Sequence, residues 1–109
     1  MTFKEYQRLS RKTAIYPGVG KNFVYPALGL SGESGEVAEI VKRIIREKKG
    51  LIDKESKKAI SKELGDVLWY LTQLAAEFNI SLEEIAKQNI EKLKSRKVRG
   101  LLHGKGNNR

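Results

Sequence analysis

Residues 60–78 read ISKELGDVLWYLTQLAAEF, and the spacing of their apolar side chains predicts a helix. At about 100° of turn per residue, those side chains fall within about 80° either side of Ile60. They are Leu64, Val67, Leu68, Leu71, Leu74, Ala75 and Phe78. Glu63, Asp66 and Tyr70 fall together in a band at one border of this face. The stretch therefore predicts a core-facing helix with a polar stripe along its edge.

The same spacing of three and four residues recurs along the chain, which predicts an all-α fold. Helices are expected over residues 3–15, from Tyr25 or Ala27 to Glu47, and over residues 54–78 and 82–97. Thr2 with Glu5 and Ser81 with Glu84 form capping boxes before the first and fourth of them. We expect a four-helix bundle in one domain over residues 1–97, followed by a basic, glycine-rich tail over residues 98–109.

Composition narrows the class of protein. The 109 residues carry a formal net charge of +9, whose field favours polyanions such as nucleotides or nucleic acid. The absence of cysteine excludes disulfides, zinc–thiolate sites and thiol nucleophiles. No apolar run is long enough to cross a bilayer, and the N-terminal residues lack the apolar stretch of a signal peptide. A cytoplasmic protein is expected, and its small size favours oligomerisation.

The second expected helix carries a further pair of carboxylates, within residues 29–40, GLSGESGEVAEI. Its apolar arc consists of Leu30, Val37, Ile40, Val41, Ile44 and Ile45. Glu33 lies inside the margin of that arc and Glu36 just outside it. Glu39 points away, toward Lys42 and Arg43 at the spacing of surface ion pairs. Glu33 and Glu36 are therefore the two that face the seam between helices.

If the second and third helices are antiparallel neighbours, four carboxylates converge: Glu33, Glu36, Glu63 and Asp66. Four negative charges at a partly buried seam repel one another unless they are protonated or bind cations. Oxygen ligands without cysteine favour a hard divalent ion, Mg²⁺ above all. The alternative is that Lys62, Lys42 and Arg43 neutralise the carboxylates as ordinary surface ion pairs.

Three side chains of the fourth expected helix add a polar edge. Asn89 falls near the middle of its apolar face, so burial and a hydrogen-bonded partner are expected for it. It could pin the helix register, or orient a carboxylate or ligand. Lys92 and Arg96 continue from Asn89 along one edge, and a cationic stripe there would suit a polyphosphate.

With these residues assembled, the chain resembles the MazG-like nucleoside triphosphate pyrophosphohydrolases of the all-α NTP pyrophosphatase superfamily. The family pattern, E-x-x-E followed by E-x-x-D, matches Glu33-Ser-Gly-Glu36 and Glu63-Leu-Gly-Asp66. The segments YPALGLSGESGEVAEIVKR, KELGDVLWYLTQLA, NIEKLKSR and GKGNNR are also similar to the family. One departure is Gly32, which stands where many members have a second acid, and it bears on the number of metal ions.

The resemblance implies a homodimer or homotetramer that depends on Mg²⁺, with Mn²⁺ as a possible substitute. It implies a house-cleaning hydrolysis of an NTP or dNTP to the monophosphate and pyrophosphate. Glu33, Glu36, Glu63 and Asp66 would hold the metal, and Glu33 or Glu36 would be the general base. Asn89, Lys92 and Arg96 would bind substrate, and Trp69 and Tyr70 would stack on the base. Trp69 points away from the core face, so a subunit contact is an equal possibility for it.

Three rival hypotheses remain. A non-enzymatic basic helical protein would bind nucleic acid through clusters such as REKKG and KSRKVRG. A structural or regulatory bundle would have lost activity, which the intact set of four acids disfavours. Phosphoribosyl-ATP pyrophosphohydrolase would share the fold and chemistry but act on another substrate.

Glycines flank both acidic motifs. Gly32, Gly35 and Gly65 cost helix stability, about 1 kcal/mol each relative to alanine. They are expected to let a neighbouring helix or a metal-bound triphosphate approach the backbone closely. Replacing Gly35 by leucine should then damage activity more than folding.

Overall fold

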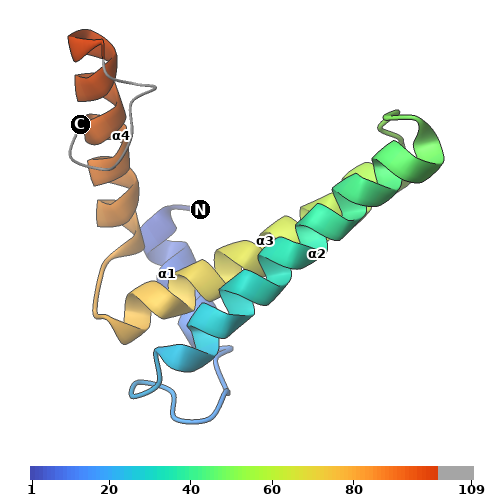
Figure 1. Ribbon diagram of the computed structural model, residues 1–109. Coiled ribbons are helices and arrows are strands. Elements are labelled where there is room, and N and C mark those ends of the chain that lie inside the picture. Colours follow the sequence, from blue (N-terminus) through green and yellow to red (C-terminus); the bar gives the residue numbers. More distant parts are fainter. Residues whose placement is uncertain (101–109) are drawn as a thin grey trace.

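The computed structural model describes residues 1–100, which form four helices and no strand (Figure 1). The helices are α1 (Phe3–Arg11), α2 (Val24–Lys48), α3 (Lys54–Glu77) and α4 (Leu82–Arg99). The all-α prediction is confirmed. Both expected caps form, since the hydroxyls of Thr2 and Ser81 accept from the amides of Glu5 (3.1 Å) and Glu84 (3.2 Å). The expected tail lies outside the described residues from position 101 onward.

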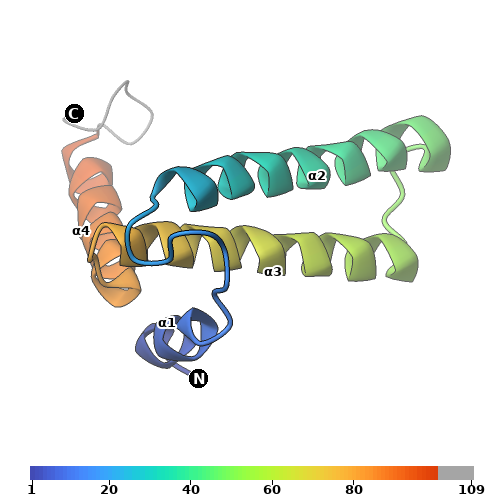
Figure 2. The same cartoon turned by 90° about the horizontal axis from the view of Figure 1, so that it is seen from below.

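The longest helices, α2 and α3, form an antiparallel hairpin and lie side by side along their length (Figure 2). A short turn joins them, in which Lys49 and Gly50 adopt positive φ angles of 53° and 80°. The Asp53 carboxylate then caps α3 by accepting from the Ser56 amide at 2.8 Å, and it pairs with Lys48 at 2.8 Å. This hairpin brings the two acidic motifs to the same level. None of the described helices has the length and apolar character needed to span a bilayer.

Helices α1 and α4 meet at one end of the hairpin. α1 packs on α3, and α4 packs on α1 while projecting away from the hairpin (Figure 1). The Gln7 side chain links them, donating to the Ile80 carbonyl at 3.0 Å and accepting from the Leu82 amide at 2.9 Å. The start of α4 is therefore fixed by α1 rather than by α2.

The first helix is shorter than expected, ending at Arg11 instead of near Ile15. The amides of Thr13 and Ala14 bond to carbonyls only three residues back, as in a tight turn. The Thr13 hydroxyl then accepts from the Trp69 indole at 2.8 Å. Contacts with α3 thus outweigh the helical pattern of residues 12–15.

The core of one chain is small and unusually polar. Its buried hydrophobic side chains are Tyr16, Ala75 and Leu82. Three further side chains are completely buried, namely Pro26, Thr72 and Gln73. Four side chains of the expected apolar faces are exposed instead: Val41 and Ile45 of α2, Leu64 of α3, and Phe78 directly after α3. Ile85, Ile90 and Leu93 of α4 are exposed as well. They are exposed because α4 does not cover the hairpin, so a single chain leaves apolar helix faces without a partner.

Candidate metal centre

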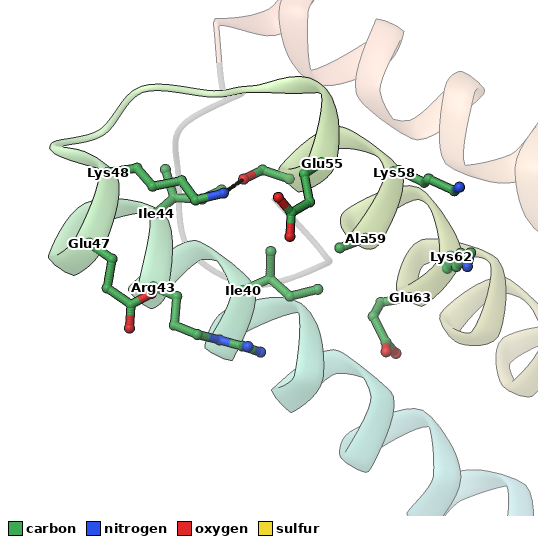
Figure 3. Close-up of a pocket in the computed structure, with 11 residues that line it drawn as sticks. Ile40, Arg43, Ile44, Glu47, Lys48, Glu55, Lys58, Ala59, Lys62 and Glu63 are labelled. Atoms are coloured by element: carbon green, nitrogen blue, oxygen red, sulfur yellow. Dashed lines mark hydrogen bonds between the residues drawn. The ribbon is translucent and has the colours of Figure 1, made fainter.

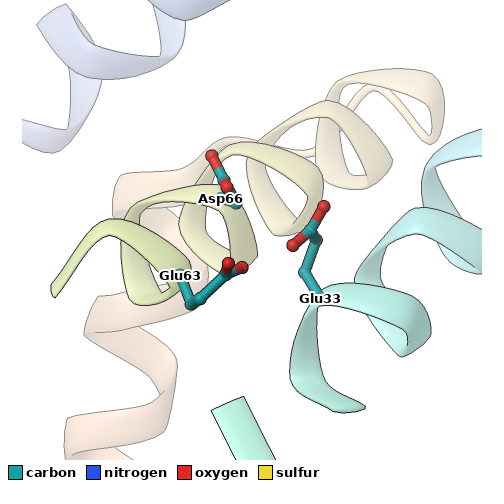
Figure 4. Close-up of side chains that lie close together, drawn as sticks. All are labelled: Glu33, Glu63 and Asp66. Atoms are coloured by element: carbon teal, nitrogen blue, oxygen red, sulfur yellow. The ribbon is translucent and has the colours of Figure 1, made fainter. Parts of the chain in front are cut away.

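Three carboxylates from the two hairpin helices converge at its middle. Glu33 of α2 faces Glu63 and Asp66 of α3, and one oxygen from each lies within 4.8 Å of the others (Figure 4). Glu63 and Asp66 are three residues apart, so they share a face of α3. Antiparallel pairing of α2 and α3 supplies Glu33 opposite them. This set is called the acidic cluster below.

The acidic cluster has electrostatic features that favour a cation. One carboxylate oxygen of Glu63, Oε2, is buried without a hydrogen-bond partner among the described residues. The pKa of Glu33 is raised, first by a side-chain hydrogen bond with Glu63, then by burial and by the neighbouring negative charges. Within residues 1–100 no lysine or arginine lies within 4.0 Å of these three carboxylates. The ion-pair alternative is therefore not what the structure contains.

The donor set fits a hard divalent cation. Carboxylate oxygens are the ligands that Mg²⁺ and Mn²⁺ take in proteins, usually alongside water and substrate phosphates. An ion would provide the partner that Glu63 Oε2 lacks and would relieve the repulsion that raises the pKa of Glu33. Part of the cluster is open to solvent, since Asp66 is exposed and Glu33 and Glu63 are half-buried. Substrate could therefore reach it.

The other two glutamates of residues 29–40, Glu36 and Glu39, lie outside the acidic cluster. Glu36 is exposed and stands outside the acidic cluster, although its charge contributes to the raised pKa of Glu33. Glu39 is also exposed and pairs with Lys42 at 3.0 Å, as expected. Of the four expected metal ligands, the structure brings together Glu33, Glu63 and Asp66.

An aromatic group borders the acidic cluster on the side of the α1–α2 loop. Tyr25 stacks on Tyr16 with ring centroids 5.1 Å apart, and Tyr70 lies edge-on to Trp69 at the same separation. Burial raises the pKa of the Tyr70 hydroxyl, and the nearby Tyr25 and Glu33 raise it further. Tyr70 is therefore placed at the edge of the cluster, as a substrate contact requires.

Trp69 points away from the core face of α3, as expected, but side chains of its own chain cover it. It is half-buried, its indole donates to Thr13, and its ring packs edge-on against Tyr16 at 6.3 Å. The loop after α1 covers it, an arrangement that a helical wheel of α3 does not represent. Trp69 is therefore covered by contacts within this chain.

The glycine that allows close approach of α2 and α3 is Gly29. A Cβ at this position would overlap the ring of Tyr70. The glycines expected to serve this purpose, Gly32, Gly35 and Gly65, have no atom within 4 Å of a built Cβ, so the expectation of a neighbouring helix is wrong within this chain. The ring of Tyr70 thus owes its position to the missing side chain of Gly29.

Replacing Gly29 by alanine should destabilise the protein by about 1–3 kcal/mol, because the new methyl group displaces the Tyr70 ring. Gly32→Ala is the matched control on the same helix. It meets open space and should stabilise the chain by up to about 1 kcal/mol through helix propensity. Urea denaturation of both variants measures the difference. Equal stability changes would contradict the role given to Gly29.

The three candidate side chains of α4 are not brought to the acidic cluster. Asn89 is exposed, so its expected burial is wrong, because α4 has no helix against that face. Arg96 is buried, with 3% of its surface exposed, and Lys92 is half-buried. Both have interactions within this chain. α4 packs on α1 at the far end of the hairpin (Figure 1).

Sequence reasoning missed Glu77, a buried carboxylate near the end of α3. Its side chain is 1% exposed and pairs with Arg11 at 2.8 Å. It also accepts from the Tyr16 hydroxyl and from the backbone amides of Gly20 (2.8 Å) and Asn22 (2.9 Å). Burial alone raises its pKa, but the hydrogen bonds from Tyr16, Arg11 and the two amides outweigh burial and lower it to about 2.

Glu77 therefore fixes the α1–α2 loop on α3 and, with it, the ring of Tyr16. Tyr16 in turn stacks on Tyr25, the first aromatic side chain of α2. The signal in the sequence was an acid inside the apolar run LTQLAAEF. Its partners are 55 to 66 residues away along the chain, so local spacing could not identify them.

The family model described as the MazG nucleotide pyrophosphohydrolase domain matches residues 26–100, a span that contains the whole acidic cluster. The chain is also similar to "Gene 37 protein" of Mycobacterium phage L5. The two are 44% identical over 109 residues, which cover 95% of this chain and 96% of the phage protein. No solved structure matches the chain.

Proposed function

Because the chain belongs to the MazG nucleotide pyrophosphohydrolase family, we propose that it hydrolyses a nucleoside or deoxynucleoside triphosphate to the monophosphate and pyrophosphate. The observation that carries this proposal is the acidic cluster, in which Glu33, Glu63 and Asp66 meet without a compensating cation among the described residues. Such a cluster repels a polyphosphate unless a divalent ion lies between them. A nucleotide carrying its own Mg²⁺ meets that requirement.

The acidic residues of the two motifs have distinct parts in this reaction. Glu33, Glu63 and Asp66 would hold Mg²⁺, or Mn²⁺ in its place. When bound, the ion neutralises phosphate charge and lowers the pKa of bound water. The water oxygen bonds to the α-phosphorus while the bond between that phosphorus and the α–β bridging oxygen breaks, and this oxygen leaves with pyrophosphate. Glu36 accepts the water's proton, because it is exposed one turn from Glu33 and outside the cluster.

The assay is pyrophosphate release from a panel of NTPs, dNTPs and phosphoribosyl-ATP, with and without Mg²⁺. We expect release from at least one nucleotide with Mg²⁺ and none in EDTA. If phosphoribosyl-ATP alone is hydrolysed, the second substrate class applies instead. Failure of every nucleotide to react, together with retention of nucleic acid on a filter, would favour a non-enzymatic binding protein.

The proposed function also involves assembly of the chain with further copies of itself. The radius of gyration is 16.7 Å, whereas a compact domain of this length has about 13 Å. Apolar side chains lie exposed along the hairpin, including Ile45 at 67% and Leu64 at 52%. We infer a homodimer or homotetramer in which these faces are covered. Asn89 and Lys92 of α4 would act at the acidic cluster of a partner copy, since α4 is remote from the cluster of its own chain.

Sedimentation measures the assembly directly. The wild-type protein should sediment as a dimer or tetramer, and Ile45→Glu should shift it toward the monomer, because a carboxylate placed in an apolar interface is desolvated. Lys49→Glu, on an exposed residue of the hairpin turn, is the control and should leave the assembly unchanged. A wild-type monomer at micromolar concentration would contradict the inference.

A further inference from the structure

The hairpin has a hollow of about 600 Å³ beyond the acidic cluster, toward its closed end. Arg43 and Lys48 line it from α2, and Lys58 and Lys62 line it from α3 (Figure 3). Glu63 of the acidic cluster forms one edge of the hollow. The basic hollow and the acidic cluster therefore share Glu63, so one extended ligand has room to contact both.

Three of its cations are not committed to ion pairs. Lys48 pairs with Asp53, and the lining residue Glu47 pairs with Arg46. Arg43, Lys58 and Lys62 have no ion pair within residues 1–100. The negative charge of Glu55, the other acid of the lining, offsets one of these three positive charges. When a metal ion neutralises Glu63, the lining of the hollow has more positive than negative charges and attracts anions.

The order of groups along the hairpin gives the site a direction. The two tyrosines Tyr25 and Tyr70 lie toward the open end, the acidic cluster lies in the middle, and the basic hollow lies toward the turn. At 1.5 Å per residue, Lys62 and Lys58 lie about 1.5 and 7.5 Å from Glu63 along the α3 axis, toward the hairpin turn. Tyr70 follows Asp66 at about 6 Å in the other direction.

We propose that Arg43, Lys58 and Lys62 bind the β- and γ-phosphates of the substrate, so that pyrophosphate leaves toward the hairpin turn and the base lies against Tyr25 and Tyr70. The inference rests on the proposed hydrolysis and specifies its orientation. Cleavage between the α- and β-phosphates moves negative charge onto the oxygen that leaves with pyrophosphate. Cations at the β- and γ-phosphates stabilise that charge as it develops. The opposite orientation would place the phosphates among phenol rings.

Binding of inorganic pyrophosphate in the presence of Mg²⁺, measured by isothermal titration calorimetry, tests the basic hollow without any turnover. Lys58→Gln/Lys62→Gln should weaken pyrophosphate binding tenfold or more, since each lysine contributes a charge-assisted bond. Lys57→Gln is the matched control, because Lys57 neighbours Lys58 but lines an apolar hollow formed with Val41 and Ile45. It removes one positive charge from the neighbouring position and should leave binding unchanged.

Binding of the product monophosphate tests the proposed orientation of the substrate. The monophosphate of the best substrate, or AMP if none is hydrolysed, should bind the double variant and the wild type within twofold of each other. Unchanged pyrophosphate binding in the double variant would overturn the proposal, and so would equal weakening of both products or of the Lys57→Gln control. If pyrophosphate binding depends on Lys58 and Lys62 but no nucleotide is hydrolysed, the hydrolase proposal fails while the anion site stands.

Discussion

Replacing Glu63 by glutamine should lower metal-dependent hydrolysis on the order of a thousandfold while leaving the metal-free protein at least as stable as the wild type. Glu63 is the member of the acidic cluster with a buried oxygen that lacks a partner. Glutamine keeps its shape and removes one of three converging negative charges. Its amide can donate a hydrogen bond to Glu33. The substitution should therefore weaken metal binding without lowering the stability of the metal-free protein.

Two measurements separate this effect from a folding defect. Mn²⁺ binding followed by electron paramagnetic resonance should weaken in Glu63→Gln, and the melting temperature in EDTA should stay the same or rise. Glu39→Gln is the control on α2, since Glu39 is exposed and paired with Lys42. Glu36→Gln should keep Mn²⁺ binding and lose turnover, as removal of a proton acceptor requires. A lower melting temperature in EDTA for Glu63→Gln would assign that residue a structural role.

Replacing Glu77 by glutamine should destabilise the protein by about 3 kcal/mol, the usual cost of removing one partner of a buried ion pair. Arg11 loses its carboxylate, and the amides of Gly20 and Asn22 lose a charged acceptor. Urea denaturation at neutral pH measures the loss. Glu83→Gln is the control, because Glu83 is exposed in the first turn of α4.

The pH dependence of this loss follows from the lowered pKa of Glu77. The native protein binds its proton less readily than the unfolded chain, whose glutamate has a pKa of about 4.5. The stabilisation is therefore complete above pH 4.5 and is lost as the pH falls toward about 2. The stability difference between wild type and Glu77→Gln should shrink over that window. A difference that is constant with pH would mean that Glu77 acts through packing rather than charge.

The sequence by itself determined the four helices and both acidic motifs. Periods of three and four residues place side chains around a helix axis, and the caps at Thr2 and Ser81 locate two helix starts. The same wheels put Glu33, Glu36, Glu63 and Asp66 on the seam and Glu39 outside it. The motifs also led to the MazG resemblance, which the family match over residues 26–100 confirms. The helices, their caps and the faces of the acidic residues depend only on short-range geometry.

Only the tertiary structure decided which of those side chains meet. It left Glu36 outside the acidic cluster, made Gly29 the glycine on which the hairpin depends, and exposed Asn89 because α4 docks on α1. It also buried Glu77 against Arg11, 66 residues away. A helical wheel gives the direction of a side chain about its own axis, but not the helix or loop that will face it. That choice belongs to packing between segments distant in the chain.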